Sequence, residues 1–240
     1  FVRAQRIHPD YFAATAARAA LELAARQPDK ARERLQAVID RNPKNVQALL
    51  AMAEVQSASN AAPDDVAALL RKAVEAAPTD RQPRVALIEH YLRRNDPKTA
   101  LTEAQGAAAA MPESPEVLDA LGRAQQANGE LNQAMASFGK LQGLMPSSPM
   151  PLLRLANAQV ANKDLPAAMQ SLRKALDMQP DLLPAQRGLV ELAVRSNQSP
   201  MALEVSKTVQ KQRPKESAGY VLEGDVHLAG KNWGSAVNAY

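Results

Sequence analysis

Three histidines are the side chains in this sequence best suited to acid–base catalysis or metal binding: His8, His90 and His227. A metal site or a catalytic pair needs several such groups at a spacing that brings them together. The histidines are scattered, none has a partner at metal-ligand spacing, and the chain has no cysteine to act as nucleophile or ligand. We therefore expect no catalytic residue, no metal ligand and no cofactor.

A second candidate for chemistry is the glycine-containing stretch from Gly224 to Gly230-Lys231, which suggests a phosphate-binding loop. That loop requires four residues between its glycines and a Ser or Thr after the lysine. Here five residues separate the glycines, and Asn232 follows the lysine. We interpret the match as a chance one.

The composition favours helices and a solvated surface. Apolar residues make up 46% of the chain and aromatic residues 3%, so the core must consist of Ala, Leu, Val and Met, which favour helix over sheet. Lys and Arg number 29, Asp and Glu 25, and the two signs are interspersed. No apolar run approaches the roughly 18 residues that cross a bilayer. We predict an all-α protein with no nucleic-acid partner and no transmembrane segment in this stretch.

The elements that would position any site are set by seven regularly spaced prolines. Neighbouring prolines are 34 residues apart, except for a gap of 35 between Pro43 and Pro78. Such a period indicates stacked supersecondary repeats rather than a single-core domain. The prolines are Pro9, Pro43, Pro78, Pro112, Pro146, Pro180 and Pro214. They define repeats at 12–45, 46–80, 81–114, 115–148, 149–182 and 183–216, a partial repeat at 217–240, and the end of a preceding repeat at 1–11.

The repeat at 115–148 predicts the structure of one unit. Apolar residues at i, i+3 and i+4 on either side of Asn128-Gly129 predict two helices joined by a turn. Ser114-Pro115 places a capping hydroxyl before a proline in the first helical turn. Each repeat is therefore expected to be a hairpin of two helices. The second repeat carries the one-residue insertion, between Ser57 and Asp65, so we expect its hairpin to be splayed.

The residues of this unit, Leu118, Leu121-Gly122, Ala134, Phe138 and Pro146, resemble the tetratricopeptide repeat family, and the resemblance covers the whole chain. It implies a right-handed superhelical α-solenoid of stacked antiparallel helix hairpins. A small residue where the two helices cross recurs as Ala31, Ala100, Ala134, Ala168, Ala202 and Ala236, with Val66 in the second repeat. Six of the eight aromatic residues fall on signature positions and are expected in the core: Phe1, Tyr91, Phe138, Tyr220, Trp233 and Tyr240.

In the same register the chain begins and ends inside the second helix of a hairpin. Phe1 and Ala4 take the aromatic and small positions of that helix, and Tyr240 takes the aromatic one again. A natural end of such an array usually carries a polar capping helix. We therefore expect an excised piece of a longer array, whose uncapped helices could associate end to end.

The resemblance also implies a concave groove lined by the first helix of each hairpin. The ninth position of that helix is polar in six repeats, and we call these residues the polar ladder: Glu54, Glu89, Arg123, Asn157, Glu191 and Asp225. Two interpretations of the ladder remain open. In one, its residues only form the solvated face that such a helix must have. In the other, the ladder hydrogen-bonds a peptide or partner helix together with Arg154 and Arg187. The fifth positions are largely apolar, which suits a hydrophobic segment, and contain no Lys, so a chaperone-type carboxylate clamp is not expected.

Two classes of function follow from these expectations. The first is a non-enzymatic scaffold that binds a peptide or partner helix in its groove. Residues 212–214 and 218–225 resemble the repeat lipoproteins of bacterial exosortase, or PEP-CTERM, systems, which implies a periplasmic, membrane-anchored full-length protein in envelope protein sorting and exopolysaccharide export. The alternative is a substrate-recruiting arm of a larger enzyme, such as a glycosyltransferase, whose catalytic domain lies outside this stretch.

Overall fold

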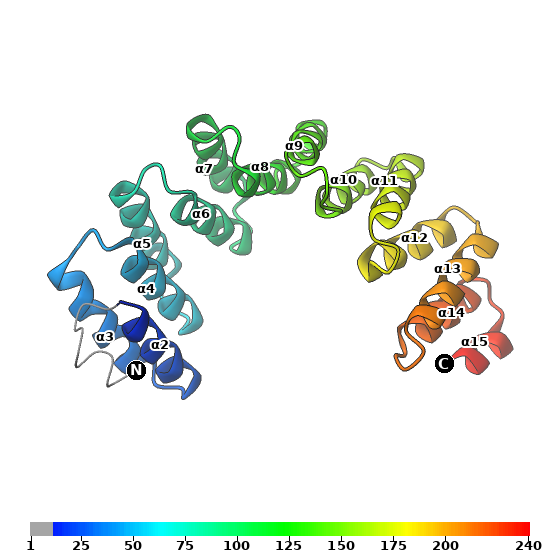
Figure 1. Ribbon diagram of the computed structural model, residues 1–240, viewed down its shortest axis with the longest axis horizontal. Coiled ribbons are helices and arrows are strands. Elements are labelled where there is room, and N and C mark those ends of the chain that lie inside the picture. The colour runs from blue at the N-terminus through cyan, green and yellow to red at the C-terminus, as the bar shows by residue number, and fades with distance from the viewer. Residues whose placement is uncertain (1–11) are drawn as a thin grey trace. The chain divides into compact units, whose positions relative to one another are not determined.

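Fourteen α-helices and no strand occur in the part of the chain that the computed structural model describes, residues 12–240 (Figure 1). The all-α prediction is confirmed, and the helices pack in sequence as stacked hairpins. Residues 1–11 lie outside the described residues, and with them the expectations for Phe1, Ala4, His8 and Pro9. Contacts divide the chain after Asn128 into two halves.

In the N-terminal half, the described helices from α2 to α8 each pack on the next helix along the chain. The first helices are α2 (Phe12–Ala24), α4 (Val46–Ala58), α6 (Arg81–Arg93) and α8 (Pro115–Ala127). The second helices are α3 (Pro28–Arg41), α5 (Pro63–Ala76) and α7 (Pro97–Ala110). First helices also contact one another, α2 with α4, α4 with α6 and α6 with α8. These contacts between first helices form one continuous face of the half.

The C-terminal half repeats the pattern. Its first helices are α10 (Met150–Ala161), α12 (Leu183–Arg195) and α14 (Ala218–Ala229). Its second helices are α9 (Leu131–Leu144), α11 (Leu165–Met178), α13 (Ser199–Gln212) and the short α15 (Trp233–Ala239). α12 packs directly on α14.

The turn inside each hairpin has one residue in the left-handed region of backbone conformation. These residues are Arg26, Asn60, Asn95, Gly129, Lys163, Asn197 and Lys231, with φ between 54° and 84°. Asn and Gly adopt this conformation readily, whereas for Arg and Lys it is strained. The turn therefore ends the first helix abruptly and lets the second helix fold back on it.

Side-chain caps begin several helices, among them the one predicted at Ser114. The Ser114 Oγ accepts a hydrogen bond from the Val117 backbone nitrogen at 3.4 Å, which confirms that cap. Asn45 caps α4 in the same way, accepting from the Ala48 nitrogen at 3.0 Å. Each of these bonds satisfies a backbone donor that the first turn leaves without an intrahelical partner.

Small side chains fill the crossings of the hairpins. The six alanines predicted there are between 0% and 3% exposed, which confirms the prediction. The insertion lies in the turn between α4 and α5, as predicted, but the splaying expected there is not seen. Val66 is buried in the same cluster as Ala53 and Leu70, so the hairpin closes around the larger side chain.

The core prediction for the aromatic residues is wrong near the C-terminal end. Tyr91 and Phe138 are buried, but Tyr220, Trp233 and Tyr240 are 42%, 62% and 61% exposed. These three lie on α14, on α15 and directly after it, and no described helix covers the far side of that hairpin. A signature position therefore gives a buried side chain only where the next hairpin packs against it.

Candidate protein-binding grooves

Three grooves lie between neighbouring first helices. One of about 520 Å³ lies between α4 and α6 in the N-terminal half. Two lie in the C-terminal half, of about 500 Å³ between α10 and α12 and about 460 Å³ between α12 and α14. The two grooves of the C-terminal half share Glu191 of α12 and so adjoin each other.

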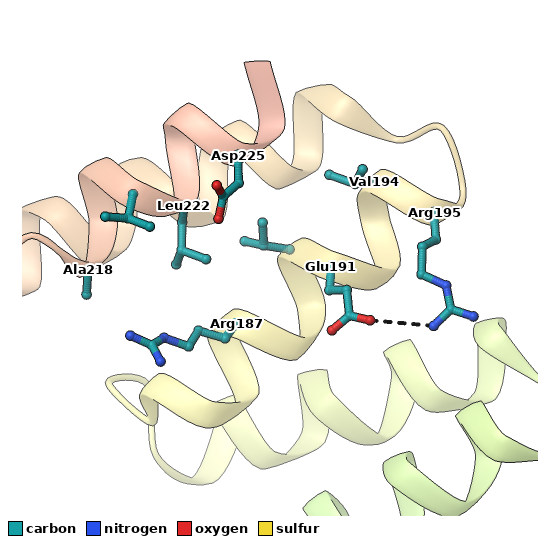
Figure 2. A pocket seen from close by; sticks show the side chains of 9 residues that line it. Arg187, Glu191, Val194, Arg195, Ala218, Leu222 and Asp225 are labelled. Atoms are coloured by element: carbon teal, nitrogen blue, oxygen red, sulfur yellow. Dashed lines mark ion pairs between the residues drawn. The ribbon is translucent and has the colours of Figure 1, made fainter. Parts of the chain in front are cut away.

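The groove between α12 and α14 combines an apolar floor with charged side chains (Figure 2). Val190 and Val194 of α12 face Ala218, Val221 and Leu222 of α14 across it. Val221 is 42% exposed, which is a large apolar surface to leave in contact with water. The charged residues are Arg187, Glu191, Arg195 and Asp225.

Three of these four charged side chains have partners and one does not. The Glu191 Oε1 lies 3.6 Å from the Arg195 Nη1, one turn along the same helix. The Asp225 Oδ1 accepts a hydrogen bond of 2.6 Å from the Tyr240 hydroxyl, and this bond raises the pKa of Tyr240. Among the residues that the structure describes, Arg187 has neither an ion pair nor a hydrogen bond through its side chain. Its guanidinium is therefore available to a bound molecule.

The groove between α10 and α12 contains three candidate residues, Arg154, Asn157 and Glu191. Apolar side chains of α10, namely Met150, Leu153 and Val160, line it as well. Asn157 is exposed and Arg154 is half-buried. The groove thus offers amide and charged groups beside an apolar strip.

In the N-terminal half, Glu54 and Glu89 line the groove between α4 and α6, together with Arg93 and Leu50. Glu54 is exposed and, within the described part of the chain, makes no side-chain hydrogen bond or ion pair. Glu89 is already paired, because both of its oxygens accept hydrogen bonds from Arg123 of α8.

Arg123 lines none of these three grooves. Its hydrogen bonds to Glu89 raise its pKa, and its side chain is only 29% exposed. The sequence placed Arg123 in the ladder as a group that could bind a partner. In the structure it instead fastens α8 to α6.

Sequence reasoning missed Val190, Val194, Arg195 and Leu222 of the groove between α12 and α14. A signal for two of them was present, because Val190 and Val194 follow Arg187 at i+3 and i+7 and so share its helix face. Leu222 precedes Asp225 by three residues and shares its face in the same way. A ladder extended by helical spacing would have included them.

The two described histidines lie on separate helices, His90 on α6 and His227 on α14. His90 is 5% exposed in α6, and burial lowers its pKa. The Nε2 of His227 lies 3.9 Å from Glu223, one turn earlier on α14. Within residues 12–240 no group of three or more His, Asp or Glu side chains could hold a metal ion. In the same range no helix is long and apolar enough to cross a membrane.

Stacked helix hairpins with grooves between their first helices define the chain as a helical-repeat protein. Residues 13–81 and 116–182, together more than half of the chain, match the model of the tetratricopeptide repeat family. The chain belongs to that family, whose repeats are generally protein-interaction scaffolds and typically non-catalytic. No curated protein matches it in sequence.

Several solved structures share this fold. The APC/C heterotetramer Cut9–Hcn1 matches with a TM-score of 0.64 at 15% identity over 92% of this chain, which spans only 44% of that one. PilW, a widely conserved type IV pilus biogenesis factor, matches at 0.68 and 17% over 87% of this chain and 96% of its own. YrrB, a tetratricopeptide repeat protein with an unusual peptide-binding site, matches at 0.55 and 18% over 77% and 95%. At these identities the likeness shows the fold alone.

Proposed function

We propose that this chain is a non-enzymatic scaffold that binds an extended peptide or a partner helix in the grooves of its C-terminal half. The observation that carries the proposal is the groove between α12 and α14. It exposes Val221 on an apolar floor beside Arg187, a cation without a partner among the described residues. A concave apolar strip with a few polar groups is the usual form of a peptide-recognition site.

Two further facts support this function. The family generally serves as a scaffold for protein–protein interaction. YrrB, which shares the fold, has a peptide-binding site, and we extend that mode of binding to this chain as part of the proposal. Asn157, Arg154 and Glu191 in the adjoining groove would lengthen the contact surface toward α10.

For the biological setting we propose the bacterial cell envelope. The support is the resemblance of residues 212–214 and 218–225 to repeat lipoproteins of exosortase systems, which act beside exopolysaccharide export. The fold shared with PilW, a pilus biogenesis factor, fits the same setting. Fractionation of cells expressing the full-length protein tests this part separately, since recovery with the cytoplasmic proteins would contradict it.

A site-specific photo-crosslinking experiment tests the binding function. A benzoyl-phenylalanine side chain at Val221 should crosslink the full-length protein to a partner in cells. The same side chain at Lys174, an exposed residue of α11 that lines none of the grooves described above, is the matched control. A third position, Leu153, tests the groove between α10 and α12 in the same way. Crosslinks from Lys174 but not from Val221 or Leu153 would exclude these grooves as the binding surface. Identification of the partner would also show whether it belongs to an enzyme, as the alternative function requires.

A further inference from the structure

We infer that the groove between α12 and α14 selects a peptide segment with an acidic residue close to a bulky apolar one. The carboxylate binds Arg187, and the apolar side chain packs on Val190, Val221 and Leu222. This inference rests on the proposed function and adds the chemistry of the partner to it.

The charges within the groove single out Arg187. Glu191 lies beside Arg195, and Asp225 accepts the Tyr240 hydrogen bond, so each has a favourable neighbour without any ligand. Arg187 has no such neighbour in the described part of the chain. A guanidinium presents several N–H donors in a planar fork that matches the two oxygens of a carboxylate. An acidic side chain is therefore the complementary group at this end of the groove.

The arrangement along α12 also fixes which end of the groove receives the acid. Arg187, Val190, Glu191 and Val194 share one face of the helix, and Figure 2 shows Arg187 at the end near Ala218. Glu191 lies four residues further on, about 6 Å along the axis, with Asp225 opposite it on α14. Glu191 and Asp225 make that level less favourable for an acid than the Arg187 end, so the acidic residue of the segment lies at the Arg187 end.

The apolar floor lies beside Arg187, within one helical turn of it. Val190 follows Arg187 by three residues, and Leu222 of α14 lies across the groove from α12 in Figure 2. An extended peptide advances about 3.3 Å per residue, so a side chain about two residues from the acid reaches this floor. The complementary sequence is an Asp or Glu about two positions from Leu, Ile, Met or Phe.

Selection from a phage-displayed library of random 12-residue peptides on the purified 240-residue chain tests the inference. The enriched sequences should place Asp or Glu about two residues from a bulky apolar residue. A synthetic peptide with the enriched sequence then serves as the probe, with its Kd measured by fluorescence anisotropy. Arg187→Glu should weaken its binding about fivefold or more, because an attraction becomes a repulsion.

Three variants separate this chemistry from general damage to the fold. Lys207→Glu makes the same change of charge on the exposed surface of α13 and should leave the Kd unchanged. Val221→Asp should abolish binding, because it puts a charge on the apolar floor. The Arg187→Glu protein should recover affinity for a probe in which the acid is replaced by Lys. Circular dichroism should show the same helix content in every variant.

The outcomes distinguish the inference from the proposed function. Enriched peptides without an acid, or acidic peptides that Arg187→Glu binds as well, would overturn the inference even if Val221→Asp abolishes binding and so upholds the groove. Peptides that bind both variants like the wild type, or a selection that enriches nothing, would contradict the groove function and the inference together.

Discussion

Arg123 of α8 holds the carboxylate of Glu89 of α6 with both terminal nitrogens, Nη1 on Oε1 and Nη2 on Oε2, the second at 2.9 Å. The two residues occupy the same position in successive first helices. Asp119, one turn before Arg123, lies 3.8 Å from the same guanidinium. The polar ladder in this half is thus partly satisfied within the fold. In the other half Glu191 and Asp225 also have partners, whereas Arg187, which lies beside the ladder, has none among the described residues.

Arg123→Ala should destabilise the N-terminal half. The side chains of Arg123 and Glu89 are 29% and 24% exposed, so removal of the cation leaves a half-buried carboxylate without its two hydrogen bonds. We expect a loss of about 1–2 kcal/mol in the free energy of unfolding, because charge-assisted hydrogen bonds at partly buried sites have about that value. Urea unfolding followed by circular dichroism measures it.

The Arg81–Glu116 pair provides the control for this variant. It joins the same two helices at 3.0 Å, but its side chains are 60% and 50% exposed. Arg81→Ala should change the free energy of unfolding by less than about 0.5 kcal/mol, as for most exposed pairs. Equal effects of the two variants would show that the pairing of Arg123 with Glu89 has no special role.

Glu22 should make the stability of the α2–α3 hairpin depend on pH. The Arg34 guanidinium, whose Nε lies 3.0 Å from the Glu22 Oε2, holds the pKa of this carboxyl below its ordinary value of 4.5. The folded state therefore binds fewer protons than the unfolded state. The stabilisation that the ionised Glu22 provides is complete above about pH 4.5, and it is lost as the pH falls through the lower pKa of the folded state.

The measurement is hydrogen exchange of the α2 and α3 amides in wild-type protein and Glu22→Gln. At pH 7 the α2 and α3 amides of the variant should exchange faster than those of the wild type. The difference should correspond to a loss of about 1 kcal/mol in local stability, since the Glu22 carboxylate is only 16% exposed. At pH 3 the two proteins should differ much less. A difference that stays the same at both pH values would mean that packing, not charge, is responsible.

The sequence predicted the hairpins well because their determinants are local. The turn at Asn128-Gly129 and the cap at Ser114 act within a few residues, and the crossing alanines act within a single hairpin, so the repeat period locates them. The structure departs from the sequence where a residue depends on a neighbouring hairpin. Tyr220 and Trp233 occupy signature positions, yet they are exposed because no described helix packs over them.

The candidate site was predictable only in part for the same reason. The ladder period indicated which helix positions face the groove, and Arg187, Glu191 and Asp225 lie there. The pattern could not show that Arg123 pairs with Glu89, because the pairing depends on how two side chains 34 residues apart extend toward each other. Nor could it show that Tyr240 bonds to Asp225.

Gly219→Ala should weaken the packing of α14 on α13. A Cβ at Gly219 would lie 2.5 Å from the backbone nitrogen of Gln210 and 2.9 Å from its Cα, so the two helices would have to move apart. We expect a loss of about 2–3 kcal/mol in the free energy of unfolding, as for other overpacked sites. Gly139→Ala in α9 is the control, because its Cβ meets nothing within 4 Å.

That control should change stability in the opposite direction. In the interior of a helix, alanine is favoured over glycine by about 0.8–1.0 kcal/mol, so Gly139→Ala should raise the urea midpoint. If Gly219→Ala raises it as well, helices α13 and α14 do not approach each other as closely as the structure indicates.

Lys163→Asn should stabilise the α10–α11 hairpin. Lys163 has φ of 63°, a left-handed conformation that costs a residue with an ordinary side chain about 1–2 kcal/mol. Asn tolerates this conformation and already occupies the equivalent turn position at Asn60, Asn95 and Asn197. We expect a gain of about 0.5 kcal/mol, measured by urea unfolding. Lys163→Ala removes the same charge but keeps the strain, so it should bring no gain. Gly129→Ala, at φ of 84°, should lose about 1 kcal/mol, since its Cβ would meet no neighbour and only the backbone would be strained. A stabilised Lys163→Ala would show that the lysine charge, rather than the turn conformation, limits the stability of this hairpin.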